Sequence, residues 1–338
     1  MTLAPTPLQT FGLGGVSVRL EGAGSAQLGR VRALLPKLFA LDLPTGGSSV
    51  GLRFRTSPLP ERAGRTVYRA RALVVTRVDG TFGLSCGLSQ LYVTPGDAEA
   101  ACFLAPDFFD HSPFEQREFF LLALLMLLRP HGLYGLHACG LRRGGVGLLV
   151  VGASGSGKTT TSLGLVRRGW RYLSDDAVLL GVRADGSVQA SAFRRGFSCT
   201  PETLTHFPEL TGDAEFGGEF GDPEGKRIVY PGEGFGSSAP DCVPSLLVFP
   251  TVTAASRSTL RPLKTAHSLI RLSQQSAGIM TDTAVSQQQL EVLTTLLGQA
   301  RSFELRLGRD ALSDPGRIDA LLRSASREEA SPCASSSS

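Results

Sequence analysis

The residues best suited to chemistry lie in one stretch of the chain, between positions 146 and 176. An apolar run, Val146–Val151, leads into the loop sequence GASGSG, and Lys158 then opens a helix-like segment that reaches Arg168. This arrangement fits the pattern G-x-x-x-x-G-K-[ST] between a strand and a helix. Glycines let successive backbone N–H groups line an anion-sized hollow, and the helix N-terminus adds donors and positive charge. The pattern predicts a loop that binds nucleotide phosphates, made of Gly152, Ala153, Ser154, Gly155, Ser156, Gly157, Lys158, Thr159 and Thr160.

Lysine is rare in this chain, which makes its positions informative. Of 34 Lys and Arg residues only four are lysines, namely Lys37, Lys158, Lys226 and Lys264. Lys158 supplies a compact point charge at the one loop position that requires it, where we expect it to reach the β- and γ-phosphates. Further candidates as cations that clamp phosphate oxygens are Lys226, Arg194, Arg195 and Arg227, with Lys226 preferred because lysine is scarce. A solvated strand edge would explain them as well.

A pair of carboxylates follows the loop. Asp175 and Asp176 come directly after a short strand-like run, Arg171–Leu173, and Asp175 lies 17 positions beyond Lys158 (175 − 158). One carboxylate there can hold Mg²⁺ together with the Thr159 hydroxyl, and the other can accept the proton of an attacking hydroxyl. Adjacent aspartates also occur in turns and helix caps, but their place behind a phosphate-binding loop favours the chemical role.

One histidine is expected near the loop. Leu133–Leu141 and Val146–Val151 are predicted to be strands joined by a turn over residues 142–145, and pairing across that turn places His137 beside Val150. His137 would then lie at the rim of the phosphate site, although a lone histidine is often a structural residue.

Residues 1–105 are predicted to be a β-rich region, because short runs of alternating or β-branched residues are separated by turn residues. Asp79-Gly80 between two such runs is typical of a two-residue hairpin. We interpret the region either as a recognition or assembly part or, with some preference, as a sheet extension packed on the core. A short helix is expected over Arg30–Leu35, ending at Pro36, and a longer one over Phe114–Leu128.

Residues 106–323 are assigned to an α/β domain that carries the loop. Within it, Gly212–Gly225 is rich in Gly, Asp and Glu and is expected to be a mobile loop. Residues 324–338 are expected to form a disordered Ser-rich tail. Further strands are predicted at 177–182, 187–193, 226–230, 245–249, 259–263 and 302–307, and helices at 265–272, 286–297 and 315–322.

Composition limits the remaining possibilities. The chain has 338 residues, 42% of them hydrophobic and 19% charged, with a net charge of +4, which is typical of a globular protein. No Lys/Arg-rich block predicts nucleic-acid binding, and the most apolar stretch, Phe119–Leu128, is too short to span a membrane. The N-terminal sequence lacks the features of a secretion signal, and the six cysteines show no C-x-x-C spacing. We therefore expect a cytoplasmic protein with reduced thiols, and neither nucleic acid nor membrane as a partner.

The segment LHACG and the later GLLVVGASGSGKTTTSLGLVRRGWRYLSDDAVLL resemble the core of the HPr kinase/phosphorylase superfamily, especially its HPr-kinase-related bacterial members. The family has a histidine 15 residues before the first loop glycine, matched by His137 and Gly152 (152 − 137). It also has an R-G-[HW]-x-x-x-x-D-D segment, matched from Arg168 to Asp176. The stretch Phe303–Asp310 resembles the closing strand of the related kinases. The resemblance is strong over residues 136–180 and weak in the rest of the C-terminal half.

This resemblance implies the fold shared with phosphoenolpyruvate carboxykinase. That fold is an α/β P-loop kinase domain whose mixed β-sheet has flanking helices and the P-loop at its edge, unlike a doubly wound sheet. By resemblance, Asp175 is the acid/base on the acceptor hydroxyl, Asp176 is the metal partner, and His137 orients the pair. A homo-oligomer is compatible with the resemblance. The glycine-rich second signature of HPr kinases is absent from Ala190–Cys199, and residues 1–105 do not match their N-terminal domain, so neither HPr as acceptor nor the phosphorylase reaction is implied.

The sequence thus predicts an ATP- and Mg²⁺-dependent kinase that phosphorylates a Ser or Thr hydroxyl of a protein or peptide, with Thr159 and Asp176 at the metal. A small-molecule hydroxyl acceptor is a close variant. The alternative from another class is a module that binds or hydrolyses a nucleotide and controls a partner without transferring phosphate. The adjacent Asp175 and Asp176 favour transfer, since a hydrolase needs only a group that positions water.

Overall fold

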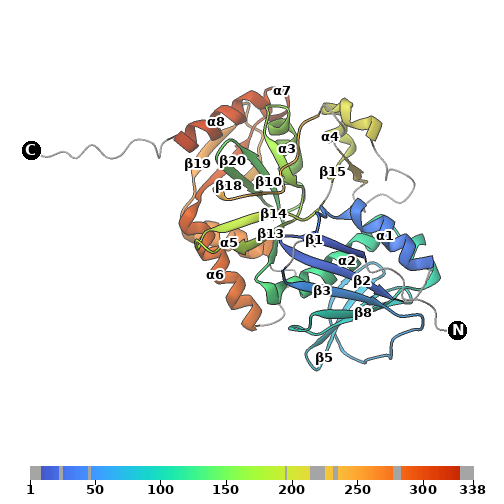
Figure 1. The fold of residues 1–338 in the computed structure, drawn as a ribbon. Helices are drawn as coiled ribbons and strands as arrows, with labels where there is room; N and C mark the ends of the chain where they lie inside the picture. The colour runs from blue at the N-terminus through green and yellow to red at the C-terminus, as the bar shows by residue number, and fades with distance from the viewer. Residues whose placement is uncertain are drawn as a thin grey trace, which may run out of the picture.

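The computed structural model divides into two regions built on separate sheets (Figure 1). It describes residues 9–22, 26–44, 47–194, 196–213, 225–230, 235–276 and 283–327. Residues 9–103 form an eight-stranded sheet, and most of the later residues surround a six-stranded sheet with two smaller sheets beside it. The structure thus has the mixed α/β character that the sequence predicts.

The first sheet has the strand order β1-β2-β3-β8-β7-β6-β5-β4. The β2–β3 and β3–β8 pairs are parallel and the other pairs are antiparallel. The N-terminal region therefore forms a sheet of its own and does not extend the six-stranded sheet, although it packs on the later region through a shared core, as expected. Its strands are β1 (Gln9–Leu13), β2 (Val16–Gly22), β3 (Ser49–Phe54), β4 (Arg65–Ala70), β5 (Leu73–Val78), β6 (Thr81–Cys86), β7 (Ser89–Val93) and β8 (Glu99–Phe103).

The turn between β5 and β6 is the predicted two-residue hairpin. Asp79 has a φ of 45° and Gly80 a φ of 82°, and Val78 pairs with Thr81 across them. Two positive φ angles match the right-handed twist of the flanking strands, and Asp and Gly tolerate them. The hairpin prediction is confirmed.

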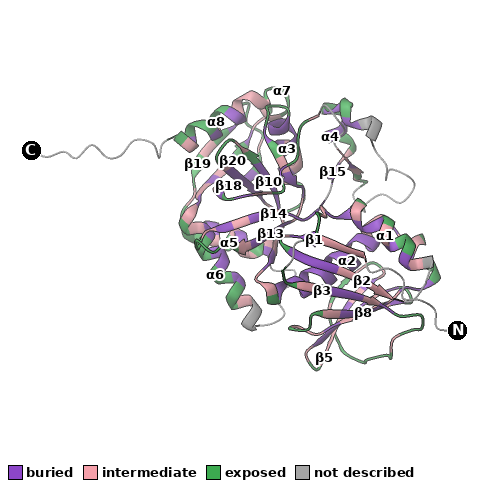
Figure 2. Cartoon of the chain, viewed as in Figure 1, coloured by how far each residue is buried: buried purple, intermediate pink, exposed green. Residues whose placement is uncertain are grey.

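Two helices pack on this sheet, α1 (Ala26–Leu38) and α2 (Pro113–Leu128). The helix α1 contains Pro36 and continues two residues beyond it, so the predicted end at Pro36 was wrong. Nearly all of α2 is buried, as expected for a helix that is apolar on all sides. It also packs on the second region, because a Cβ atom on Gly135 would lie 2.7 Å from Leu125 Cδ2. In Figure 2, β2 and β3 are largely buried beside these helices.

The second region is centred on a sheet with the order β12-β10-β11-β18-β20-β19. The pairs β11–β18 and β18–β20 are parallel, and β10–β11, β10–β12 and β19–β20 are antiparallel. The strand that leads into the glycine-rich loop, β11, is therefore an inner strand rather than an edge strand. The strands are β10 (Ala138–Arg143), β11 (Val146–Val151), β12 (Arg171–Ser174), β18 (Pro244–Val252), β19 (Thr259–Pro262) and β20 (Arg301–Leu307).

Both faces of this sheet are covered, and the residues of β11 alternate between them. Leu148 and Val150 belong to a core with α3 and α8, and Leu149 and Val151 belong to a core with α5 and α6. A strand buried on both faces is a continuous apolar run, which explains the sequence of Val146–Val151. The helices are α3 (Lys158–Val166), α4 (Pro201–His206), α5 (Thr265–Ser276), α6 (Thr283–Gln299), α7 (Asp310–Ser313) and α8 (Pro315–Arg327), with short 3₁₀ helices at Pro106–Asp110, Arg129–His131 and Pro208–Asp213.

The predicted single strand over Leu133–Leu141 is two strands in two sheets. One, β9 (Tyr134–Leu136), pairs with β13, and the other is β10. His137 lies between them, and Cys139 rather than His137 pairs with Val150. The smaller sheets have the orders β17-β14-β13-β9 and β15-β16. Their other strands are β13 (Val178–Val182), β14 (Val188–Ala192), β15 (Phe197–Cys199), β16 (Arg227–Val229) and β17 (Asp241–Cys242).

Several predictions concern segments at the limits of the described chain. The helix α8 continues to Arg327, so the start of a disordered tail at residue 324 was wrong. The rest of that tail, and residues 214–224 of the predicted mobile loop, lie outside the described residues.

Of the cysteines, the five at described positions are buried and free: Cys86, Cys102, Cys139, Cys199 and Cys242. Among the helices in the described part of the chain, none combines the length and the apolar character needed to cross a bilayer.

Candidate active site

Three chain segments meet at the end of the six-stranded sheet where β11 and β12 end and β10 begins. The strands β11 and β12 run in the same direction, because each is antiparallel to β10, which lies between them. The glycine-rich loop follows the end of β11, the two aspartates follow the end of β12, and His137 precedes the start of β10. The topology therefore brings together groups that lie far apart along the chain.

The loop after β11 is shaped by two glycines with positive φ. Gly155 has a φ of 78° and Gly157 a φ of 95°, values that favour glycine. A Cβ atom on Gly157 would lie 2.5 Å from Leu307 Cδ1, whereas one on Gly155 would have nothing within 4 Å. Packing therefore requires glycine at 157, and Gly155 faces open space that a ligand can enter. The helix α3 begins at Lys158, so its unpaired N–H groups also lie at this loop.

The side chain of Lys158 folds over the loop. Lys158 is only 5% exposed, and its Nζ lies 3.1 Å from the Ala153 carbonyl oxygen and 3.1 Å from His137 Nε2. The same Nζ lies 3.7 Å from Asp176 Oδ1. The ammonium group is thus held against a carbonyl of the loop, within reach of any phosphate bound there.

Asp175 is buried, and its carboxylate accepts hydrogen bonds from three directions. Thr159 Oγ1 donates to Oδ1 at 3.1 Å, Cys139 Sγ donates to Oδ1 at 2.9 Å, and the Ser198 amide donates to Oδ2 at 2.8 Å. Burial, and then the charge of Asp176, raise the pKa of Asp175 above its usual range. The sequence analysis paired Thr159 with Asp176, but the structure brings the Thr159 hydroxyl to Asp175.

Asp176 faces a different set of partners. Its φ of 70° lies in the left-handed region, and this turn of the backbone separates its side chain from that of Asp175. Arg194 Nη1 donates to Oδ2 at 2.8 Å, and His137 Nε2 lies 3.4 Å from Oδ1. Burial disfavours ionisation, but the neighbouring positive charges, above all that of Arg194, outweigh it and hold the pKa of Asp176 well below its usual range. Asp176 is therefore ionised at neutral pH.

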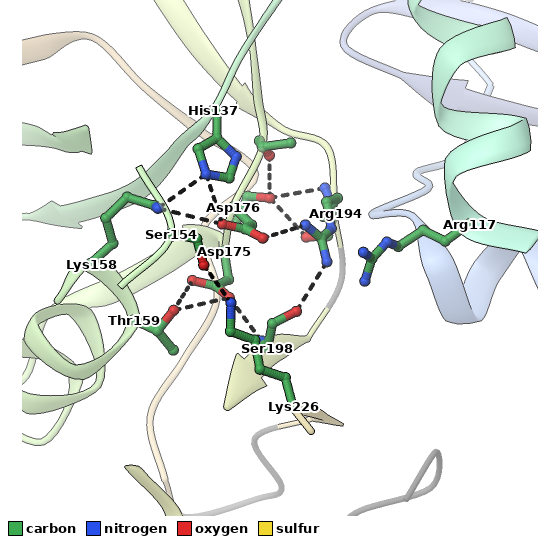
Figure 3. Close-up of polar contacts among 12 residues, drawn as sticks. Arg117, His137, Ser154, Lys158, Thr159, Asp175, Asp176, Arg194, Ser198 and Lys226 are labelled. Atoms are coloured by element: carbon green, nitrogen blue, oxygen red, sulfur yellow. Dashed lines mark hydrogen bonds and ion pairs between the residues drawn. The ribbon is translucent and has the colours of Figure 1, made fainter. Parts of the chain in front are cut away.

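His137 stands between Lys158 and Asp176, as Figure 3 shows. Its backbone N–H donates to the Gln275 carbonyl at 3.2 Å, which fixes the position of the residue. Burial lowers the pKa of His137, the charge of Asp176 opposes this shift, and the charges of Lys158 and Arg194 lower the pKa further, so that the net shift is downward. The imidazole is thus neutral at pH 7 and can accept a hydrogen bond from Lys158.

Of the predicted phosphate clamps, Lys226 contacts the loop in the structure. Lys226 precedes β16, which pairs with β15, and its Nζ donates to Ser154 Oγ at 2.7 Å. Lys226 therefore contacts the loop directly. Arg195 lies outside the described residues.

A cavity of about 360 Å³ opens beside the loop. One wall is polar and includes Asp176, Ser198, Thr203 and Lys226. Another wall is apolar and is formed by Val252, Leu307, Ala311 and Leu312. A cavity with a cationic loop at its base, a carboxylate on one side and an apolar wall on another suits an amphipathic anion such as a nucleotide.

The residues around the loop also fit a triphosphate with Mg²⁺. Ser156 Oγ is buried and has no hydrogen-bond partner within the described residues, as expected for a hydroxyl that waits for a ligand oxygen. The neighbouring hydroxyl and carboxylate of Thr159 and Asp175 are ligands that Mg²⁺ prefers. In the described chain, no three His, Cys, Asp or Glu residues form a metal-binding group. A cation would therefore need phosphate oxygens and water as further ligands.

Arg194, one of the predicted phosphate clamps, contacts the Asp176 carboxylate, a contact that the sequence did not predict. Besides the bond to Asp176, its Nη2 donates to Ser198 Oγ at 3.2 Å, and Arg194 is 5% exposed. Its Nε has no hydrogen-bond partner within the described residues. Arg117 from α2, also 5% exposed, faces it in Figure 3. The sequence has 30 arginines (34 − 4), so only their positions in space distinguish these two.

One segment of the chain is similar to known proteins. The chain is 41% identical over 68 residues to the HPr kinase/phosphorylase of Caldanaerobacter subterraneus subsp. tengcongensis, and 40% identical over 68 residues to that of Brevibacillus brevis. These matches cover 20% of this chain and 20% and 19% of the relatives, so the chain spans about a fifth of their length. The resemblance to HPr kinases is thereby confirmed over this segment.

Two further comparisons concern the chain as a whole. The structure titled Hpr(Ser) kinase/phosphatase from Coxiella burnetii is similar with a TM-score of 0.30 and 14% sequence identity, covering 58% of this chain and 99% of that one. No protein-family model matches the chain.

Proposed function

We propose that this protein is an ATP- and Mg²⁺-dependent kinase that transfers the γ-phosphate to a Ser or Thr hydroxyl of a protein or peptide. One observation carries the proposal: Asp176 lines the cavity at the loop, with its carboxylate 3.7 Å from Lys158 Nζ. A phosphate-binding lysine next to an ionised carboxylate is the combination that phosphoryl transfer to a hydroxyl requires. The similarity of one segment to HPr kinase/phosphorylases supports it.

The geometry leads us to exchange the roles that the resemblance implies for the two aspartates. Asp175 is buried beside Thr159 and does not line the cavity. Thr159 and Asp175 would therefore hold Mg²⁺, which when bound neutralises charge on the phosphate oxygens. Asp176 lines the cavity and is the carboxylate that an acceptor hydroxyl can reach.

In the proposed reaction the acceptor oxygen forms a bond to the γ-phosphorus while the bond from that phosphorus to the β,γ-bridging oxygen breaks, and ADP leaves. Asp176 accepts the proton of the hydroxyl. Its cationic neighbours make it a weak base, but phosphoryl transfer depends more on orientation and charge than on base strength. Lys158 and Lys226 would stabilise the charge on the phosphate oxygens, and His137 would orient Lys158 and Asp176.

The finer expectations about the fold remain part of this proposal. We assign residues 106–323 to a catalytic domain of the phosphoenolpyruvate carboxykinase type, although α2 packs in the core of the N-terminal sheet. The apolar cavity wall of Val252, Leu307 and Leu312 would take the nucleobase. The competing candidate is a module that hydrolyses nucleotide without transfer, and a small-molecule hydroxyl is a variant acceptor.

The proposal can be tested with γ-labelled ATP. Wild-type protein, Mg²⁺ and a lysate from its own source should give label in a protein or peptide, and purified HPr can be offered as one defined acceptor. Asp176→Asn should lower transfer at least about a hundredfold while ATP still raises the melting temperature, because the loop is intact. Lys158→Ala should abolish that stabilisation, which amounts to about 2.7 kcal/mol at a hundredfold excess over Kd.

Asp185→Asn is the matched control, since this carboxylate lies in an exposed turn bonded to Ser187. It should leave both readouts unchanged. Release of free phosphate without label in any acceptor would favour the hydrolysing module. Normal transfer by Asp176→Asn would refute Asp176 as the base.

A further inference from the structure

We propose that the N-terminal region contributes to the active site by positioning one of its residues. The segment of residues 37–42 and Arg117 of α2 hold Arg194 against Asp176. In this proposal Phe39 and Arg117 are positioning residues that act through Arg194. The catalytic part of the inference rests on the proposed kinase function, whereas the positioning itself can be observed without it.

The segment of residues 37–42, which begins with the last two residues of α1, is held at two positions. Asp42 pairs with β1 through two backbone hydrogen bonds, of 2.8 and 2.9 Å. Three residues earlier, Phe39 forms an antiparallel β-bridge with Arg194. The backbone of Arg194 is therefore fixed with respect to the eight-stranded sheet by a short piece of extended chain.

Further contacts hold Arg194 from two sides. The rings of Phe39 and Phe193 are stacked with centroids 5.3 Å apart, both residues are fully buried, and Ala40 N donates to the Phe193 carbonyl at 3.0 Å. On the other side, Ser174 Oγ accepts from Arg194 N and donates to Arg194 O, each at 2.9 Å. Arg194 is thus clamped between the N-terminal segment and the residue that directly precedes the two aspartates.

The side chain of Arg194 is also held in place by contacts from two sides. Its guanidinium contacts Asp176 at 2.8 Å and Ser198 at 3.2 Å, and both of these residues line the cavity. From the far side, α2 presents the buried Arg117, whose Nε donates to Glu118 at 3.2 Å (Figure 3). Because two buried like charges repel, Arg117 disfavours any position of Arg194 that is turned away from Asp176.

This arrangement separates two properties of the site. Nucleotide binding depends on the loop, α3 and Lys158, which these contacts do not include. The orientation of Asp176 toward an acceptor depends on Arg194, and through it on the N-terminal sheet. Loss of Phe39 or Arg117 should therefore lower kcat and leave the KM for ATP unchanged.

The experiment compares matched pairs of variants. Phe39→Leu removes the ring that stacks on Phe193, and Phe82→Leu is its control, because Phe82 is equally buried in the same core. Arg117→Gln removes the charge, and Arg117→Lys restores it. We expect Phe39→Leu and Arg117→Gln to lower kcat about tenfold or more. Phe82→Leu and Arg117→Lys should stay within about twofold of wild type.

A second readout does not need catalysis. The Nε–Hε resonance of Arg194, assigned by its loss in Arg194→Lys, should exchange slowly in the wild-type protein because the group is buried. Its exchange should accelerate at least about tenfold in Phe39→Leu and Arg117→Gln but not in Phe82→Leu. Unchanged exchange in Phe39→Leu, or equal loss of kcat in Phe82→Leu, would overturn the inference. If the wild-type protein transfers no phosphate but the variants show the expected differences in hydrogen exchange, the proposed function is refuted. The positioning of Arg194 by the N-terminal region would still hold.

Discussion

At the scale of single residues, the contact between Asp176 and Arg194 dominates the site. Removing one partner of a fully buried pair costs about 3–5 kcal/mol, since the other charge is left uncompensated. Asp176 has 22% of its side chain exposed and Arg194 has 6%. We therefore expect Asp176→Asn to destabilise the protein by roughly 2–3 kcal/mol, measured by urea unfolding. Asparagine also tolerates the positive φ at this position, so the substitution isolates the charge.

Asp241→Asn supplies the matched control for that measurement. Asp241 lies 3.8 Å from Arg142, and both side chains are at least 40% exposed. Such a pair contributes about 0–1 kcal/mol, so this variant should unfold close to the wild-type midpoint. Equal stability of both variants would show that Asp176 does not hold the charge of Arg194.

The residues that a pattern can name are those whose chemistry is tied to a fixed spacing. Lys158, Thr159, His137 and the two aspartates were predicted in this way, and the structure brings them together. Which aspartate meets Thr159 could not be predicted, because adjacent positions are separated only by the backbone turn at Asp176. Arg194 was predicted only as one of several phosphate clamps, and its contact with Asp176 could not be predicted, since it depends on how the chain folds in space.

At the scale of elements, the start of α2 combines a cap with a tertiary contact. Ser112 and Glu115 form a capping box, and Glu115 also accepts a hydrogen bond from the Ala72 amide at 3.1 Å. Burial disfavours the charged form, but these hydrogen bonds outweigh it and lower the pKa of Glu115. The stabilisation is therefore complete above the unfolded pKa of about 4.3 and is lost as the pH falls through the lower folded value.

Glu115→Gln should remove this part of the acid sensitivity. We expect it to cost about 1–2 kcal/mol at pH 7, the range of a lost cap, and the difference from wild type should shrink as the pH falls below about 4. Urea midpoints measured between pH 7 and pH 3 check this. A difference that stays constant over that range would contradict the assignment of the carboxylate as the group that titrates.

Elements were predictable where a local signal fixes them. Asp79-Gly80 determines a hairpin through its backbone angles, and α2 follows from a long apolar run that ends before Pro130. The run Leu133–Leu141 gave the wrong result, because one long strand and two short strands in different sheets have the same apolar pattern. The break at His137 is imposed by the sheets on either side, and no local residue signals it.

At the scale of the whole molecule, the two sheets share a core. Leu133, Leu179 and Phe193 from the later part of the chain belong to the same buried cluster as the N-terminal strands. We therefore expect the regions to unfold together. The single tryptophan, Trp170, is 2% exposed and bonded to Asp319, so its fluorescence reports on the six-stranded sheet. Its transition should coincide with that of the far-UV circular dichroism.

Phe82→Ala tests this coupling from the opposite end of the molecule. The substitution lies in β6 and should cost about 3–5 kcal/mol. Both transitions should move to lower urea concentration by the same amount. An unchanged fluorescence midpoint would mean that the six-stranded sheet is stable without the N-terminal one.

The position of Lys158 also bears on which nucleotides can enter. The ammonium group of Lys158 contacts the Ala153 carbonyl and His137, and these contacts compete with a bound phosphate for the lysine. A nucleotide therefore has to interact with the Lys158 ammonium group more strongly than these two groups do. A chain of two or three phosphates can do so, whereas we expect the single phosphate of AMP to leave the lysine in place. This position of Lys158 would thereby disfavour the binding of AMP.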